Sequence, residues 1–79
     1  MKLPRDLSGR EFGQLIGRLG YVLDHQRGSH MRFTCKDPDH QLTVPDHRSL
    51  RAGTLASLLR QIMEQHNLDR DDLLKLLFD

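Results

Sequence analysis

A chain of 79 residues, 37% of them hydrophobic, can build one thin core and leaves no room for a deep enclosed pocket that would hold a cofactor. No stretch approaches the roughly 18 to 20 apolar residues of a membrane span, the start lacks a secretion signal, and the single Cys35 cannot form an internal disulfide, so we expect a cytoplasmic protein. Residues 1–60 hold ten Lys or Arg against six Asp or Glu, whereas residues 61–79 hold two against five, and a basic body of this kind suits a polyanion such as nucleic acid.

The first predicted element is a helix that begins after Ser8 and ends at Gly20. Ser8 and Glu11 have the spacing of a capping box, in which each side chain accepts a hydrogen bond from the other residue's backbone amide. Apolar side chains then recur at helical spacing, at Phe12, Leu15, Ile16 and Leu19. A β-favouring segment follows from Tyr21 to about Gln26, and Arg27-Gly28-Ser29 is predicted to be the turn after it.

Residues 30–36 have the most regular pattern in the chain. Their apolar members, Met31, Phe33 and Cys35, alternate with polar ones, which is the two-residue period of a half-buried strand. Four polar side chains therefore share one face of this strand: His30, Arg32, Thr34 and Lys36. Residues 36–40 are typical of a turn, and a third strand is expected from Gln41 to Val44, ended by Pro45.

Two further helices are predicted after a loop at residues 46–51. Thr54 is suited to cap the first of them, whose apolar stripe consists of Leu55, Leu58, Leu59, Ile62 and Met63. We interpret this stripe as core rather than as a partner groove. Asp69 and Asp72 indicate the start of a short last helix, with an apolar face of Leu73, Leu74, Leu77 and Phe78.

This order of elements predicts an α+β fold, a two-layer α-β-β-β-α sandwich. The two main helices should pack on one face of a three-stranded sheet, because each apolar stripe needs the apolar sheet face, and the other face should stay wet. We expect a single domain over residues 1–79, with its core at 3–66 and a helical extension at 69–78.

His30 is the first candidate for chemistry, because it begins the second strand on the polar face. An imidazole titrates near ~6.5, and Arg32 and Lys36 on the same face would attract phosphate. RNA carries its own nucleophile, the 2′-OH, so its cleavage needs an acid or base and positive charge but no cofactor. The same pattern also fits an ordinary exposed histidine at the edge of a strand.

The second candidate is the start of the helix after residue 51. Arg48, Arg51 and the free amides around Gly53-Thr54 could bind phosphate at the positive end of the helix dipole, or could be a capped helix with solvated arginines. A metal site is not expected, because His30 and Cys35 are an odd number of residues apart on one strand and project from opposite faces. We expect Cys35 to pack as a small buried hydrophobe.

Six segments, in this order and at these spacings, resemble a known family: Leu3-Pro4-Arg5, Ser8-Gly9-Arg10-Glu11, Leu19-Gly20-Tyr21, Gln26-Arg27-Gly28-Ser29-His30, Val44-Pro45-Asp46-His47 and Gly53-Thr54-Leu55. The chain is similar over residues 3 to about 62 to the HicA, or YcfA-like, family of bacterial toxin–antitoxin systems. The resemblance implies a fold similar to a double-stranded-RNA-binding domain, messenger-RNA cleavage without metal or other cofactor, and neutralisation by a HicB-type antitoxin protein.

The resemblance also implies roles for particular residues. The catalytic histidine of the family falls on His30, Gly28 and Ser29 form the turn that presents it, and His47 matches the histidine of the Val-Pro-x-His segment, as an acid or base, a phosphate contact or a loop anchor. The expected RNA-binding residues are Gly28, Ser29, Arg32, Lys36, His47, Arg48, Arg51 and Thr54. We therefore favour a metal-independent endoribonuclease toxin, with a non-catalytic double-stranded-RNA-binding module as the alternative and a pure protein-interaction partner as a third class.

Overall fold

The computed structural model of the protein describes residues 5–79. The elements follow in the order α1 (Gly9–Ile16), η1, a 3₁₀ turn (Gly17–Leu19), β1 (Val22–Arg27), β2 (His30–Lys36), β3 (Asp39–Pro45), α2 (Ala52–His66) and α3 (Arg70–Phe78). The Leu3-Pro4 pair of the family resemblance, and the expected start of the core at residue 3, lie outside the described residues.

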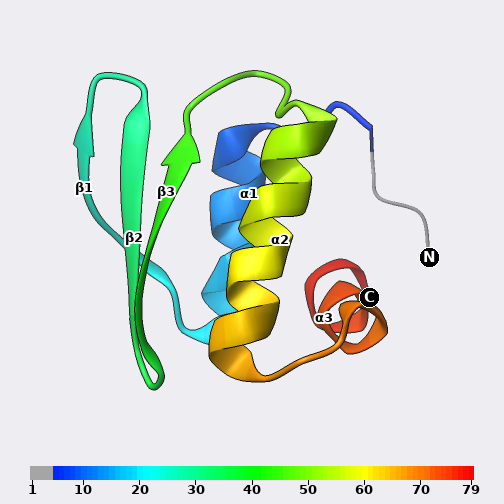
Figure 1. The fold of residues 1–79 in the computed structure, drawn as a ribbon. Helices are drawn as coiled ribbons and strands as arrows, with labels where there is room; N and C mark the ends of the chain where they lie inside the picture. Colours follow the sequence, from blue (N-terminus) through cyan, green and yellow to red (C-terminus); the bar gives the residue numbers. More distant parts are fainter. Residues whose placement is uncertain (1–4) are drawn as a thin grey trace.

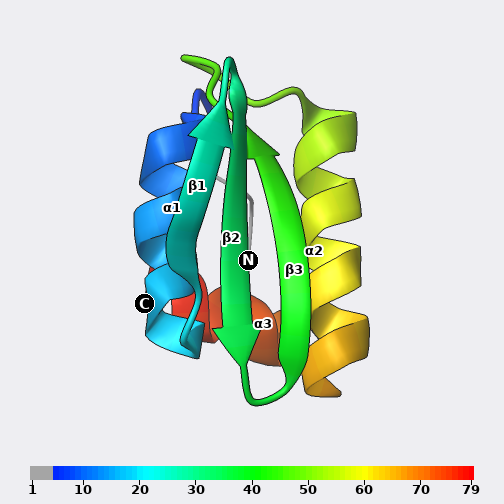
Figure 2. The ribbon, with the colours of Figure 1, turned by 90° about the vertical axis from the view of Figure 1, so that its left-hand side faces the viewer.

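The strands form one antiparallel sheet in the order β1-β2-β3, and the helices lie on one side of it. Figures 1 and 2 show α1 and α2 on the same side of the sheet, α1 near β1 and α2 near β3, while α3 lies farther from the strands and between the two helices. Over residues 5–79 no helix covers the other sheet face, which we call the open face. The α+β fold expected from the sequence is therefore confirmed, and its arrangement resembles that of a double-stranded-RNA-binding domain.

The first helix begins where the sequence predicts. The Ser8 hydroxyl accepts a hydrogen bond from the Glu11 amide at 3.0 Å, and the Glu11 carboxylate accepts one from the Ser8 amide at 3.0 Å. Gly9 packs so closely on the last residue of β3 that a side chain there would collide with the Pro45 carbonyl oxygen. Gly20, with a φ of 97°, ends the helical segment after η1.

The strand bounds differ from the prediction in β1, which is shifted by one residue, and in β3, which is longer, because the pairing continues up to the turns. Arg27 is the last residue of β1 and pairs with His30, so the turn between β1 and β2 is Gly28-Ser29 alone. Likewise, β3 begins at Asp39 and not at Gln41. The alternation of β2 is confirmed: its odd-numbered residues are buried and its even-numbered residues face the open side.

The prediction that Thr54 caps the second helix was wrong. α2 begins at Ala52, and the capping position is Arg51, whose side chain makes no capping hydrogen bond. Thr54 therefore lies within the first turn of the helix. The start of α2 is held instead by its neighbours, since Leu50 and Leu55 on either side of it are buried.

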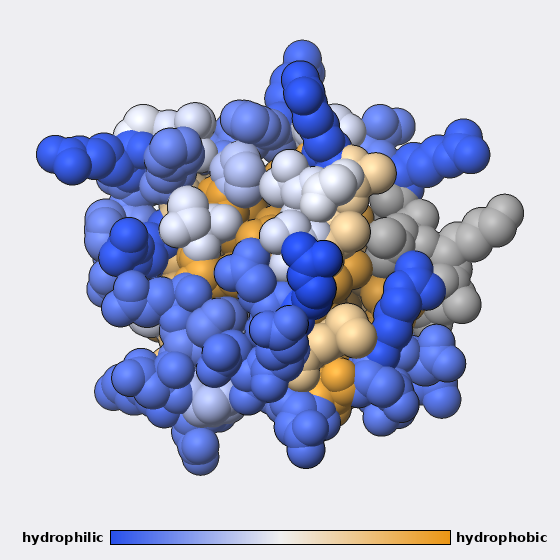
Figure 3. Space-filling view, in the orientation of Figure 1, coloured by the Kyte–Doolittle hydropathy of each residue, from blue (hydrophilic) through white to orange (hydrophobic). Residues whose placement is uncertain are grey.

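The core lies between the sheet and the two main helices and extends to α3. Its fully enclosed side chains, with at most 1% exposed, are Phe12, Ile16, Leu42, Val44, Ile62, Leu73, Leu74 and Leu77. The stripe on α2 is confirmed as core, and Cys35 is buried as expected. In Figure 3 the surface is mostly hydrophilic, with apolar atoms visible only in strips between polar side chains.

A polar cluster of three distant residues lies at the edge of this core. The Tyr21 hydroxyl is hydrogen-bonded to His40 Nδ1 at 2.6 Å and to His66 Nε2 at 3.0 Å. Burial raises the pKa of Tyr21 to about 12. Burial, and the neighbouring His66, lower the pKa of His40. The cluster ties β3 and the last turn of α2 to the segment that enters β1.

The last helix is capped at both ends. Asp69 accepts a hydrogen bond from the Asp72 amide at 2.8 Å, which confirms the predicted start of α3. At the other end, Arg18 of η1 donates to the carbonyl oxygens of Leu76, Leu77 and Asp79 at 3.1 to 3.2 Å. These carbonyls have no partner within the helix, so the guanidinium acts as its C-terminal cap. None of the helices in residues 5–79 is long and apolar enough to cross a membrane.

Candidate functional site

A shallow hollow on the open face contains His30. It has a volume of about 190 Å³. Its lining residues are His25, Arg27, His30, Arg32 and Thr43. His30 begins β2 and is exposed, as the sequence predicts, whereas Cys35 on the same strand points into the core. The hollow therefore presents two imidazoles and two guanidiniums to solvent.

A β-bulge in β1 brings two of these side chains to the hollow. The pairing of β1 with β2 shifts between Leu23 and His25. After this shift, His25 lies opposite Arg32. One step further along the same face, Arg27 lies opposite His30. Because cross-strand partners project to the same face, both His25 and Arg27 stand on the open face.

Neither His25 nor Arg27 is among the site residues expected from the sequence. Strict alternation counted from Leu23 places both on the side of β1 that faces the helices. One feature of the sequence does predict the positions of His25 and Arg27, namely the two-residue turn Gly28-Ser29. Counting pairs outward from that turn places Arg27 beside His30 and His25 beside Arg32.

The His25 ring is held by its neighbour Asp24. Nδ1 of His25 lies 3.0 Å from Oδ2 of Asp24, and the two side chains are 58% and 55% exposed. A carboxylate can only accept a hydrogen bond, so Nδ1 carries the hydrogen and Nε2 is the nitrogen left for another partner. This contact orients the ring and leaves Nε2 available to a ligand.

The turn that presents His30 depends on a glycine. Gly28 has a φ of 58°, in the left-handed region that side chains other than glycine rarely adopt. Glycine at the first position of a two-residue turn matches the twist of the strands on either side. Ser29 follows, and its carbonyl accepts a hydrogen bond from the Asp46 amide at 2.7 Å.

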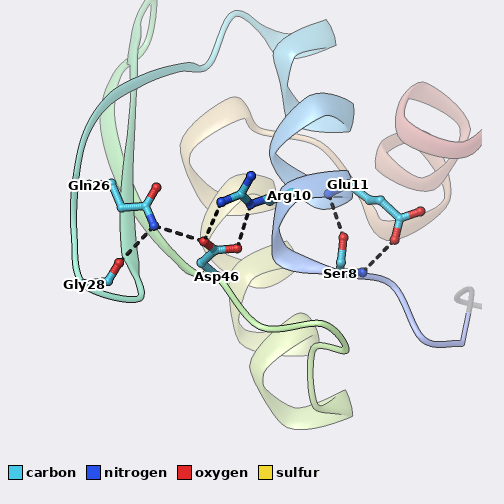
Figure 4. A network of polar contacts seen from close by, with 6 residues as sticks. All are labelled: Ser8, Arg10, Glu11, Gln26, Gly28 and Asp46. Atoms are coloured by element: carbon cyan, nitrogen blue, oxygen red, sulfur yellow. Dashed lines mark hydrogen bonds and ion pairs between the residues drawn. The ribbon is translucent and has the colours of Figure 1, made fainter.

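A network around Asp46 holds this turn from the helix-facing side (Figure 4). Gln26 donates from Nε2 to the Gly28 carbonyl at 2.9 Å and to Asp46 Oδ2 at 3.0 Å. Arg10 of α1 donates from Nε and Nη2 to the two carboxylate oxygens of Asp46, at 3.1 and 3.2 Å. Hydrogen bonds from Arg10, and then from Gln26, hold the pKa of Asp46 below its usual range. We call Arg10, Gln26 and Asp46 the turn network.

The other expected site residues fall into two groups. His47, Arg48 and Arg51 are exposed in or beside the loop that enters α2, and Thr54 is half-buried in the first turn of that helix. Figure 1 shows this loop and the Gly28-Ser29 turn at the same end of the molecule. The amide of Gly9 donates to the His47 carbonyl at 2.9 Å, so the backbone at this histidine is held by α1.

Lys36 belongs to the other end of the sheet. It shares the open face with His30, but six residues of strand separate them, or about 20 Å at ~3.3 Å per residue. Lys36 lines a different hollow, with Val22, Thr34 and Asp37 among its neighbours. The cationic neighbours of His30 in the structure are therefore Arg27 and Arg32, and Lys36 is not one of them.

Comparison with known proteins gives one family match. The model of a family described as the HicA toxin of bacterial toxin–antitoxin systems matches residues 9–63, well over half of the chain. Curated proteins and solved structures gave no match. The matched residues run from α1 into α2 and include the hollow and the turn network, whereas α3 lies beyond them.

Proposed function

The chain belongs to the HicA toxin family of bacterial toxin–antitoxin systems, and on that premise we propose that it is a metal-independent endoribonuclease that cleaves messenger RNA. In this proposal His30 is the general acid or base, and the whole chain acts as one domain. The 2′-OH of RNA attacks the adjacent phosphorus, so the protein has to move protons and stabilise charge on the phosphate.

The observation that carries the proposal is the placement of His30 in the hollow between Arg27 and Arg32. Guanidiniums form paired hydrogen bonds with phosphate oxygens, so these two arginines are suited to hold the scissile phosphate against the ring. The ring is exposed and needs no rearrangement to meet a substrate. Gly28 and Ser29 let a backbone approach closely, because neither has a bulky side chain.

Further contacts would follow the RNA away from the hollow. His47, Arg48, Arg51 and Thr54 surround the first turn of α2, where free amides and the helix dipole favour phosphate. Lys36 would meet a phosphate at the opposite end of β2. Contacts to phosphates on both sides of His30 would position the phosphate between them in the hollow.

The cognate antitoxin, in this proposal, is a HicB-type protein that covers the open face. That face presents more cations than carboxylates around His30, so an acidic or capping surface is the simplest complement to it. Coverage of the hollow would silence the site by exclusion of RNA. The antitoxin need not change the fold of the toxin.

The chemistry of the products tests the proposed function. Purified protein in the presence of EDTA is expected to cut RNA and to leave 2′,3′-cyclic phosphate and 5′-hydroxyl ends, because the 2′-OH is the nucleophile. RNA with a 2′-deoxy nucleotide at a mapped cleavage site should bind equally and stay intact there. Binding without any cleavage would favour the alternative RNA-binding module, and the absence of both would favour a protein-interaction partner.

The turn network should matter for the rate rather than for binding. Asp46→Ala removes the acceptor shared by Arg10 and Gln26 and frees the turn that carries His30. We expect kcat for RNA cleavage to fall about tenfold with little change in RNA affinity, since a misplacement of ~1 Å can cost about 10²-fold. Single-turnover kinetics and a binding titration measure the two quantities. Asp39→Ala, an exposed aspartate at the far end of β3, is the control, and equal kcat values for the two variants would contradict this role.

A further inference from the structure

We propose that His25 is a second catalytic residue, the general acid that protonates the leaving 5′-oxygen while His30 acts as the base. This inference rests on the proposed ribonuclease function. The inference adds that the two proton transfers of the reaction are divided between two side chains. The observation behind it is that the bulge in β1 places His25 in the hollow that contains His30.

The spacing of the two rings suits a phosphate between them. His25 lies opposite Arg32, and His30 is two residues from Arg32 on the same strand face, so the two histidines are diagonal neighbours. Diagonal neighbours in an antiparallel pair lie about 7–8 Å apart. A phosphate that occupies the hollow can therefore have one imidazole on each side, one within hydrogen-bond reach of the neighbouring 2′-OH and the other within reach of the 5′-oxygen.

The His25 and His30 rings have different charged neighbours. The Asp24 carboxylate at 3.0 Å orients the His25 ring, with Nδ1 toward the carboxylate and Nε2 left to donate to the leaving oxygen. The charged neighbours of His30 within the hollow are the cations Arg27 and Arg32, and none of the residues that line the hollow is a carboxylate. Thr43 of β3, which also lines the hollow, carries no charge.

In the resulting reaction His30 removes one proton and His25 supplies one. Nε2 or Nδ1 of neutral His30 takes the proton of the 2′-OH, and the 2′-oxygen forms a new bond to phosphorus. The bond between phosphorus and the 5′-oxygen breaks, and that oxygen takes the proton from Nε2 of the His25 imidazolium. The products are a 2′,3′-cyclic phosphate and a 5′-hydroxyl, with His30 charged and His25 neutral. Arg27 and Arg32 stabilise the negative charge on the phosphate oxygens throughout.

A substrate whose leaving group needs no proton tests this assignment. The probe is an RNA in which the 5′-oxygen at a mapped cleavage site is replaced by sulfur, since a thiolate leaves without an acid. We expect His25→Asn to lower cleavage of ordinary RNA by about 10²-fold or more and to cleave the sulfur RNA at nearly the wild-type rate. His30→Asn, the matched variant, should stay slow on both RNAs. Circular dichroism should show both variants folded, since both side chains are exposed.

The outcomes separate this inference from its premise. If His30→Asn is inactive and His25→Asn cleaves ordinary RNA at the wild-type rate, the second acid is ruled out while the proposed function stands. An equal loss for His25→Asn on both RNAs would also overturn the assignment, because it would indicate a structural or binding role. If the wild-type protein cleaves neither RNA, the proposed function fails and the inference fails with it.

Discussion

His30→Ala is expected to lower the rate of RNA cleavage by about 10²- to 10⁴-fold, the usual contribution of one positioned acid or base. The ring is exposed at the start of β2, so its removal leaves no cavity, and the free energy of unfolding should change little. RNA affinity should also stay close to that of the wild type, because Arg27 and Arg32 remain in the hollow. Single-turnover cleavage, a binding titration and urea denaturation measure the three quantities.

The matched control for this variant is Gln65→Ala, an exposed position on α2 outside the open face, which should cleave RNA as the wild type does. In cells, expression of the wild-type chain should arrest growth, and His30→Ala should not. A variant that binds and cleaves RNA normally without this ring would rule out the catalytic role of His30.

Leu74→Ala is expected to lower the free energy of unfolding strongly. Its side chain on α3 has 0% of its surface exposed, and truncation of a buried leucine costs about 2–5 kcal/mol. A chain of this length has an expected free energy of unfolding of roughly 4–12 kcal/mol, at about 0.05–0.15 kcal/mol per residue. The substitution should therefore remove a large part of the total stability, although α3 lies outside the residues matched by the family model. Urea denaturation should show a lower midpoint with an unchanged slope.

Leu76→Ala provides the comparison within the same helix. Leu76 is 46% exposed, so its truncation should change the free energy of unfolding by about 0.5 kcal/mol or less. Both variants change the helix propensity of α3 in the same way, which isolates the effect of burial. Equal stability of the two variants would mean that α3 contributes little to the core.

Local patterns in the sequence were sufficient to predict most of the fold. The capping box at Ser8, the alternation in β2 and the aspartate cap at Asp69 each depend on residues within one turn or one strand. The start of α2 was misplaced because no side chain caps it at Arg51. A helix that begins without such a contact leaves no local signature, and contacts made in the folded chain fix its position, namely the burial of Leu50 and Leu55 and the hydrogen bond from the Leu50 amide to the Leu7 carbonyl.

Only part of the candidate site could be predicted from the sequence. His30 is the first residue after the turn, so alternation alone places it on the open face. His25 reaches that face only through the shift in pairing after Leu23, which is a property of two strands together. The cluster of Tyr21, His40 and His66 is a still clearer case, because its members meet only in the folded chain.

The position of α3 has an electrostatic consequence for the whole molecule. This helix and its cap carry four carboxylates, Asp69, Asp71, Asp72 and Asp79, against two cations, Arg70 and Lys75, on the side that faces away from the strands, whereas the arginines and histidines of the hollow lie on the opposite side. The charges of a protein with a net charge of only +1 are thus unevenly distributed between these two sides. Near a polyanion we expect this distribution to favour encounters in which the sheet faces the phosphates.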